Sequence, residues 1–437
     1  MEKIKKIVND KESIILKILF VLACVMFAVP SIEYYINNKT VFQFDQWFKF
    51  LLNNSDRFEQ TIIYLIVLTI LTILYIILIK NRKKIFKNTK TMFIFIAIIA
   101  VIFVAVIPFT CSDVFYYLGI GRINNTYGQN PYYTTIKDFV DAGDNSQYLS
   151  QDTVLAQGYI NDWADSTVVY GPIWTLICNI VAGLSFGNTD IGLLVFKMIN
   201  VIVHICNCYL IYKITNKKIF ALIYGLNPFV LIEGIACVHN DMLVVLFILL
   251  TLYFLLKRKN LVVSLIFLAL ATTIKYFPIL LLPFIIIYHF RKEKPLKRFG
   301  KCIQYGLIFA IFVIIPYILY IRDIEVFAGI FTQQEKLAKS IYIIVTEYFG
   351  SIPNVVNQLK KLLLGAFVII YAAVCIVLLN KKEISFRNQM RKYEYFLVAF
   401  LFLLITNFQP WYILWVFPCM MWQKSEDINT IIRNISN

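Results

Sequence analysis

The stretch FIFIAIIAVIFVAVIPFTCSDVFYY, residues 93–117, combines a membrane-spanning segment with the start of a polar site. Its apolar part, 93–109, is close to the length that crosses the ~30 Å hydrocarbon core of a bilayer. Asp113 follows at once, and a carboxylate at the edge of the hydrocarbon is costly unless something uses it. A long acidic loop begins there, which carries Asp138, Asp141, Asp144, Asp152, Asp162 and Asp165 against only Arg122 and Lys137.

The composition is that of a polytopic membrane protein. Apolar residues make up 59% of the 437 residues and charged residues 16%. The formal net charge is +16, and the Lys and Arg residues cluster in short connectors at 3–11, 80–90, 213–218, 257–259, 291–301 and 381–392. Such clusters follow the positive-inside rule, so the basic excess indicates orientation and no nucleic-acid partner is expected.

The apolar segments predict an all-α fold with about 12 transmembrane helices, in a range of 11–13, in one domain over 1–437. Predicted spans fall at 14–34, 61–80, 91–109, 191–212, 219–238, 242–256, 261–275, 277–290, 303–321, 362–380, 393–408 and 411–423. Every strongly basic connector then lies on the cytoplasmic side, together with both termini. The extracytoplasmic loops are 110–190 and 322–361.

The segment 168–187 is apolar but does not fit this alternation. Counted as a span, it would place Lys213, Lys217 and Lys218 outside and invert every later loop. We therefore expect a re-entrant or interfacial outer helix, which is tolerated where protein covers its backbone.

Several candidate functional residues follow Asp113. Tyr116 and Tyr117 share a helical face with Asp113, whereas Arg122 lies on the opposite face unless the helix bends at Gly119 or Gly121. The alternative is that Asp113 only caps a helix and the tyrosines belong to an interfacial aromatic belt.

The outward turns between paired short spans contain further unusual polar residues. They are His239-Asn240-Asp241, Lys275, and Gln409-Pro410-Trp411. Capping by Asn240 or Asp241, snorkelling by Lys275 and a belt position for Trp411 are the alternatives for each residue alone. The predicted topology nevertheless brings all of these residues to the face that carries Asp113.

A metal site is not expected. The nine cysteines are scattered through apolar stretches, apart from Cys111 at a loop start and Cys302 in a basic connector. The Cys206 and Cys208 spacing matches no common zinc or redox motif. With three histidines far apart in sequence, a metal cluster has few ligands.

An outward carboxylate, nearby cations and aromatic residues at a lipid boundary suit glycosyl transfer from a lipid-linked sugar. The carboxylate deprotonates an acceptor hydroxyl, and cations hold the charge of a phosphate leaving group. No Gly-rich phosphate loop and no Asp-x-Asp at Asp113 occur in the sequence, so a nucleotide-sugar donor is not indicated.

These residues also resemble motifs of the GT-C superfamily of integral-membrane glycosyltransferases, especially bacterial polyprenol-phosphate-mannose-dependent α-mannosyltransferases. The similar motifs run in the family's order from about 110 to 420. They are Asp113-Val114-Phe115-Tyr116-Tyr117 with Gly121-Arg122, Asn130-Pro131-Tyr132, Tyr170-Gly171-Pro172, Asn227-Pro228, His239-Asn240-Asp241, Lys275 with Pro278 and Pro283, and Pro410-Trp411-Tyr412.

The resemblance implies an inverting hexosyltransferase, mannose-like in its sugar, with Asp113 as the general base on the extracytoplasmic side. The donor is a polyprenyl-phosphate sugar and the acceptor a glycan or lipid hydroxyl, with no cofactor. The implied substrate-binding residues are Tyr116, Tyr117, Arg122, Tyr170, His239, Asn240, Asp241, Lys275, Gln409 and Trp411. Many relatives have paired acidic residues in the first loop, whereas here Asp113 stands alone, so a divalent metal is not expected.

Two other functions compete with this hypothesis. A transporter or flippase of lipid-linked sugars would account for about twelve spans and for the intramembrane residues Lys197, His204 and Glu233. It would be expected to show internal repeats and polar residues at the midplane. A polysaccharide polymerase or ligase of the outer leaflet would share the topology and the lipid donor.

Overall fold

The computed structural model describes residues 2–37 and 57–422, and these residues are helical with no strand among them. The part before Asp113 contains α1 (Glu2–Asn37), α3 (Arg57–Lys80), α4 (Arg82–Ile85), α5 (Thr89–Ile102) and η1 (Phe103–Ala105). The acidic loop forms α6 (Asp113–Asn125), α7 (Ile136–Asp141), η2 (Asn145–Ser150), α8 (Thr153–Tyr159) and α9 (Pro172–Leu184).

The middle of the chain supplies the helices behind the site. They are α10 (Thr189–Thr215), α11 (Lys218–Gly225), α12 (Pro228–Leu231), η3 (Ile232–Ala236), α13 (Asp241–Tyr253), η4 (Phe254–Arg258), α14 (Leu261–Thr272), η5 (Phe277–Leu281), α15 (Leu282–His289) and α16 (Pro295–Tyr317). The last part forms η6 (Ile324–Phe327), α17 (Ala328–Glu335), α18 (Ile341–Phe349), α19 (Val355–Asn380), α20 (Phe386–Ala399), η7 (Phe400–Leu404) and η8 (Pro410–Trp422).

The expected all-helical class is confirmed, but the expected twelve spans are not. Within the described residues, four helices are long and apolar enough to cross a membrane, namely Lys11–Val29 of α1, α10, α16 and α19. A fifth results if α11 and the α12–η3 helix, bent by 55° at Pro228, form one broken span. Other predicted spans correspond to shorter apolar stretches, such as Leu65–Lys80 of α3, Leu261–Thr272 and Phe277–His289, which fall below the ~20 residues of an upright crossing. The end of the 411–423 span and the C-terminus predicted to be cytoplasmic lie outside the described residues.

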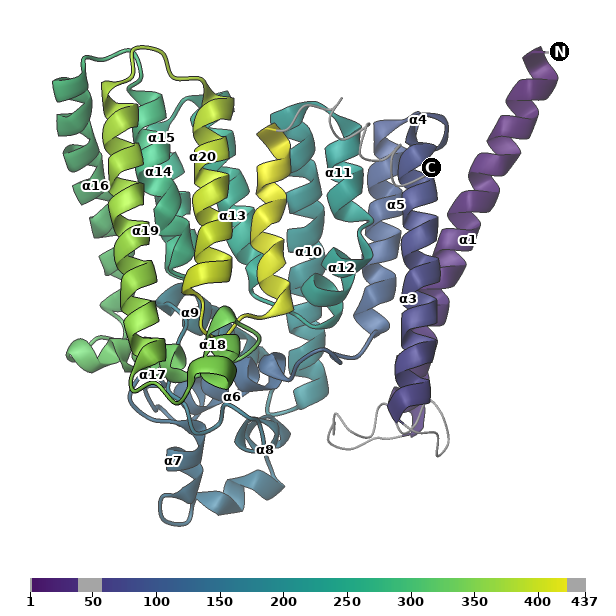
Figure 1. Ribbon diagram of the computed structural model, residues 1–437. Coiled ribbons are helices and arrows are strands. Elements are labelled where there is room, and N and C mark those ends of the chain that lie inside the picture. Colours follow the sequence, from purple (N-terminus) through teal and green to yellow (C-terminus); the bar gives the residue numbers. More distant parts are fainter. Residues whose placement is uncertain (1, 38–56, 423–437) are drawn as a thin grey trace.

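The two ends of the helix bundle differ in character (Figure 1). Helices α6 to α9, α17 and α18 gather at one end, whereas the basic connectors around α4, before α11, before α16 and before α20 lie at the other. At this basic end, Lys218 Nζ donates to the carbonyls of Phe86 and Lys87. The separation of acidic and basic ends is the arrangement that the connector charges predicted.

Helix α9 lies within the predicted segment 168–187, and both of its ends contact segments at the end of the bundle that holds α6. Gly171, the N-cap of α9, donates its backbone N–H to the Ile274 carbonyl in the turn after α14. At its other end, the Gly187 carbonyl accepts from Thr153 of α8. Gly121 lets α6 approach α9 closely, because a Cβ there would lie 2.1 Å from the Cys178 carbonyl oxygen. Helix α9 is thus packed along α6 before the chain turns into α10.

Candidate active site

Asp113 is the first residue of α6, and Ser112 is the N-cap. The carboxylate is therefore not the capping residue, although its position in the first turn is favourable to the helix dipole. Its side chain is nearly buried, with 7% exposed. Tyr117, one turn further on, directs its hydroxyl at Asp113 Oδ2 at 3.5 Å and also lies 3.3 Å from the Tyr170 hydroxyl.

The surroundings of Asp113 act on its protonation in opposite directions. Burial raises the pKa of Asp113, and the nearby Asp241 acts in the same sense. His239, Lys275 and a hydrogen bond from the Trp163 side chain lower this pKa, but burial has the larger effect. A carboxylate with a raised pKa is a stronger base once it is ionised.

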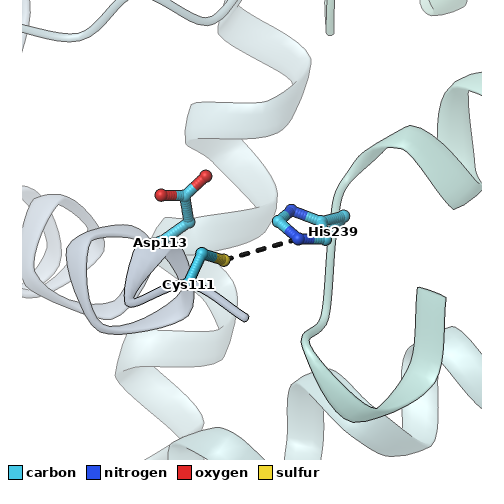
Figure 2. A group of neighbouring side chains, drawn as sticks. All are labelled: Cys111, Asp113 and His239. Carbon is cyan, nitrogen blue, oxygen red and sulfur yellow. Dashed lines mark hydrogen bonds between the residues drawn. The ribbon is translucent and has the colours of Figure 1, made fainter. Parts of the chain in front are cut away.

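Cys111 and His239 lie beside Asp113 (Figure 2). The Cys111 Sγ is 3.4 Å from His239 Nε2, and the same ring nitrogen lies 3.1 Å from Glu233 Oε2. The His239 ring is fully buried and stacks on Trp411 with a centroid separation of 3.9 Å and an angle of 17° between the planes. The predicted residues His239 and Trp411 therefore meet next to Asp113, as the topology indicated.

Cys111, Asp113 and His239 also form a group of metal-ligand types whose donor atoms all lie within 4.8 Å of one another. Sulfur and imidazole donors suit zinc-like ions, whereas Mg²⁺ and Mn²⁺ prefer oxygen ligands. His239 Nε2 is already in contact with Cys111 and with Glu233. We therefore interpret this group as a hydrogen-bonded cluster.

A second buried cluster surrounds Lys275. Its ammonium nitrogen lies 2.7 Å from Asp241 Oδ1, and the same oxygen accepts from the Trp415 indole N–H. The ammonium group faces the rings of Tyr170, Tyr412 and Trp415 at 5.9, 4.8 and 5.4 Å from their centroids. Such an aromatic enclosure stabilises a cation that has lost most of its water.

Two cavities open onto these clusters and share part of their walls. The first is a narrow pocket of about 30 Å³, lined by Asp113, Tyr116, Trp163, Ser166, Val169, Tyr170, Gln333, Gln409, Trp411 and Tyr412. The second is a groove of about 560 Å³ that contains Lys275 and Lys360 among apolar side chains such as Phe277, Phe331, Leu364, Phe400 and Leu404. Val169, Tyr170, Gln333 and Tyr412 line both cavities. An acidic pocket thus adjoins an amphipathic groove.

Arg122 is not brought to Asp113. Helix α6 runs through Gly119 and Gly121 without a break, which carries Arg122 about 13 Å along its axis from Asp113. There Arg122 Nε is paired with Asp152 Oδ2 at 2.6 Å, and Tyr127 donates to the same oxygen at 2.9 Å. Arg122 lines neither the narrow pocket nor the groove.

The remaining predicted residues have distinct positions. Tyr116 lines the narrow pocket and donates to the Ser166 carbonyl at 3.0 Å, and Gln409 lines the same pocket. Asn240 is fully buried, and among the described residues its amide has no hydrogen-bond partner. It lies between His239 and Asp241 but lines neither cavity.

Sequence reasoning missed Trp163, Gln333 and Trp415 as residues of this site. Trp415 lies four residues after Trp411, a spacing that could have suggested a shared face, but both residues also suit an aromatic belt. Trp163 and Gln333 reach the pocket through the folding of the two outer loops, for which the sequence carries no periodic signal.

The intramembrane polar residues Lys197 and His204 have backbone partners. Lys197 donates to the carbonyls of Val104 and Val106, where the helix around η1 ends. His204 Nε2 lies 3.0 Å from the Gly225 carbonyl at the end of α11. Both residues satisfy carbonyls at helix breaks, which is a structural explanation for their burial.

Comparison with protein-family models gives a match over residues 19–291 to the MptA_B family, described as alpha-(1->6)-mannopyranosyltransferase, N-terminal domain. The matched region contains Asp113, His239, Asp241 and Lys275. Comparisons with curated proteins and with solved structures gave no match. Because the family model covers more than half of the 437 residues, the chain belongs to this family of mannosyltransferases and is a membrane glycosyltransferase.

Proposed function

We propose that this enzyme transfers a mannosyl residue from a polyprenyl phosphate to a hydroxyl of a glycan or lipid acceptor, with inversion at the anomeric carbon. The observation that supports this proposal is the shared wall between the Asp113 pocket and the Lys275 groove. The groove has apolar side chains suited to a polyprenyl tail and a cation suited to its phosphate. The pocket has a carboxylate and tryptophans suited to a sugar hydroxyl and a sugar face.

In the proposed reaction, Asp113 accepts the proton of the acceptor hydroxyl while the hydroxyl oxygen attacks the anomeric carbon of the donor sugar. The bond between that carbon and the donor phosphate oxygen breaks, and the electron pair leaves with the polyprenyl phosphate. Lys275 offsets the charge that develops on this phosphate, and Asp241 orients the ammonium group. Tyr117 donates to Asp113 in the ground state and keeps the carboxylate directed at the pocket.

Transfer is proposed to need no divalent metal. Asp113 is the one carboxylate among the residues that line the narrow pocket, and its neighbours Cys111 and His239 offer donors that Mg²⁺ and Mn²⁺ bind poorly. The leaving phosphate would be stabilised by Lys275 in place of a metal ion.

The test is a reconstituted assay with several polyprenyl-phosphate sugars and detection of the released lipid phosphate. Asp113→Asn is expected to lower mannosyl transfer by about 10³-fold. Asp162→Asn is the matched control, because Asp162 is an exposed carboxylate of the same loop. Normal transfer by the Asp113 variant would contradict the assignment of the base, and transfer from a nucleotide sugar alone would contradict the donor.

The proposed orientation places the site on the extracytoplasmic face, with the basic end of the bundle in the cytoplasm. Single cysteines at Asp141 and Lys297, both exposed, report on the two ends. A thiol reagent that does not cross membranes should label position 141 in intact cells and position 297 only after lysis. The opposite pattern would contradict this orientation.

A further inference from the structure

A basic pocket lies at the end of the bundle opposite α6, between the connector after α15 and the connector after α19 (Figure 1). Its volume is about 460 Å³, which is within the range of ligand-binding cavities. The lining contains six cationic side chains, those of Arg291, Lys292, Lys294, Arg298, Lys381 and Lys382. The lining carboxylates are Glu293 and Glu383, and Glu293 is already paired at 2.8 Å with Lys297. The pocket therefore has an excess of positive charge that its own carboxylates do not balance.

Arg298 lines this pocket but is nearly buried, with 2% of its surface exposed. Its guanidinium group donates to five backbone carbonyls, those of Arg291, Glu293, Leu378, Leu379 and Lys381. The Nε atom is buried and has no hydrogen-bond partner among the described residues. Within the same part of the chain, no carboxylate forms an ion pair with Arg298. A full positive charge is thus held inside the protein at the edge of the pocket without an anionic partner.

The bonds of Arg298 have a structural role, because they fasten the connector before α16 to the end of α19. They do not neutralise its charge, since the carbonyls at a helix C-terminus supply only about half of an elementary negative charge. The start of α16 adds further positive potential: Lys294 is its N-cap, Pro295 is its first residue, and its first turn has no acidic residue. Both residues line the pocket. An anion in the pocket would compensate the charge that these groups leave unbalanced.

The position of the pocket indicates the source of such an anion. Helices α16 and α19 lie side by side, are long and apolar enough to cross a membrane, and bury few of their residues in the protein (Figure 1). The pocket forms where α16 begins and α19 ends, which is the level of the lipid headgroups for helices of this length. Leu296, Phe299 and Ile303 are exposed in the first turns of α16, where acyl chains would cover them.

We infer that this pocket binds the headgroup of an anionic phospholipid from the leaflet at the basic end of the bundle. Basic pockets between transmembrane helices are suited to such headgroups. The exposed lysines form charge-assisted hydrogen bonds with the lipid phosphate, and the buried charge of Arg298 strengthens the attraction. This lipid is distinct from the proposed polyprenyl donor, because the groove that contains Lys275 lies at the other end of the bundle.

The experiment measures lipid binding to the purified full-length protein in detergent by native mass spectrometry. The probe is dioctanoyl phosphatidylglycerol, and dioctanoyl phosphatidylcholine, which has no net charge, should bind about tenfold more weakly. The pocket variant Lys294→Gln Lys382→Gln removes two exposed cations of the lining and should raise the Kd for phosphatidylglycerol about tenfold. Arg298 is left unchanged because its bonds to two connectors support the fold. The control Lys257→Gln Lys259→Gln makes the same change of charge at two exposed lysines outside the lining, and should leave the Kd within about twofold.

Equal increases in Kd in the pocket and control variants would overturn the inference, because they are the result of a general attraction to the basic end. An unchanged Kd in the pocket variant would also overturn it. Each single lysine variant should give an intermediate increase, so the test holds if the double variant does not accumulate. Sodium phosphate at the concentration of the lipid should leave lipid binding unchanged, and displacement of the lipid by phosphate would mean that the pocket takes a free anion instead. Mannosyl transfer is not the readout, so a failure of the proposed function would leave this result intact.

Discussion

Lys275 and Asp241 form a buried ion pair with a distance of 2.7 Å between Nζ and Oδ1, and Lys275 lines the amphipathic groove. Asp241 is fully buried, and the Lys275 side chain is 11% exposed. The pair joins the start of α13 to the turn after α14, and Trp415 of η8 binds the same Asp241 oxygen. Three segments far apart in sequence thus meet where the donor phosphate is proposed to bind.

Removal of the Lys275 charge should affect both stability and catalysis. Lys275→Ala leaves Asp241 buried without its cation, which is expected to cost about 3 kcal/mol of unfolding free energy. Loss of the charge that is proposed to face the leaving phosphate should lower kcat/KM by about 10²-fold. The measurements are thermal or denaturant unfolding in detergent and transfer from polyprenyl-phosphate mannose.

Two comparisons separate these effects. Adding Asp241→Asn to Lys275→Ala should restore part of the stability but none of the activity, since the uncompensated charge is gone and the cation is still missing. Lys297→Ala removes one partner of an exposed ion pair and should cost less than about 1 kcal/mol. Recovery of activity in the double variant would argue against a role for Lys275 in phosphate binding.

The pH dependence of transfer should report the environment of Asp113. Only the ionised carboxylate accepts a proton, so kcat should fall as the pH drops through the pKa of Asp113. Because burial raises this pKa, the acid limb should lie above the usual range of an exposed aspartate. A limb within that usual range would contradict the buried position of the base.

The same raised pKa has a consequence for stability. The folded state binds the Asp113 proton more tightly than the unfolded chain does, so the contribution of this group to stability is lost as the pH rises through the folded-state pKa. Asp113→Asn, which is neutral at every pH, is therefore expected to be at least as stable as the unmodified protein near neutral pH. A strongly destabilised variant would mean that its inactivity cannot be assigned to the missing base.

Much of the fold could be predicted from the sequence because a bilayer leaves few choices for an apolar chain. Apolar runs indicated the helices, and connector charges indicated which helix ends lie together. The broken helices could not be predicted in this way. The π-helical turns η3 and η7 depend on neighbouring helices: the Gly234 carbonyl of η3 accepts from Asn200 of α10, and the Leu403 carbonyl of η7 accepts from Tyr342 of α18.

The site was predictable where residues lie in short turns between spans. His239, Asp241, Lys275 and Trp411 are fixed to one face by the length of the helices, and the structure brings them together around Asp113. Trp163 and Gln333 were missed because they lie in the long outer loops. Their positions follow from contacts such as Lys336 with Ser166 and with the Trp163 ring, which join distant segments.

The amphipathic groove should determine how well a long lipid donor binds. Leu364 of α19 lines the groove, and Leu364→Asp places a charge where a polyprenyl tail is proposed to lie. We expect KM for a long-chain donor to rise about tenfold, with little change for a short-chain analogue. Leu362→Asp is the matched control, because Leu362 is on the same helix, is also exposed and does not line the groove. Equal effects of the two substitutions would argue against this lipid path.

Arg122 was predicted to be a substrate-binding residue, and its pairing with Asp152 leads to a different expectation. Arg122 Nε and Asp152 Oδ2 are 2.6 Å apart, and Asp152 is also the N-cap of α8, whose side chain accepts from the Leu155 N–H. Arg122→Gln should therefore lower the unfolding free energy by about 2 kcal/mol, since it leaves the buried Asp152 without its cation. The kcat and the KM for the donor should stay within about twofold of the unmodified values in the protein that folds.

Asp152→Asn provides the second half of this test. It keeps an N-cap of similar quality but removes the charge, so it should destabilise the protein less than Arg122→Gln and should also leave the kinetics unchanged. Unfolding curves and donor-saturation curves for both variants distinguish a structural ion pair from a phosphate site. A large rise in KM for the donor in Arg122→Gln but not in Asp152→Asn would indicate that Arg122 binds the donor. Helix α6 would then have to bend at Gly119 or Gly121 when substrate binds.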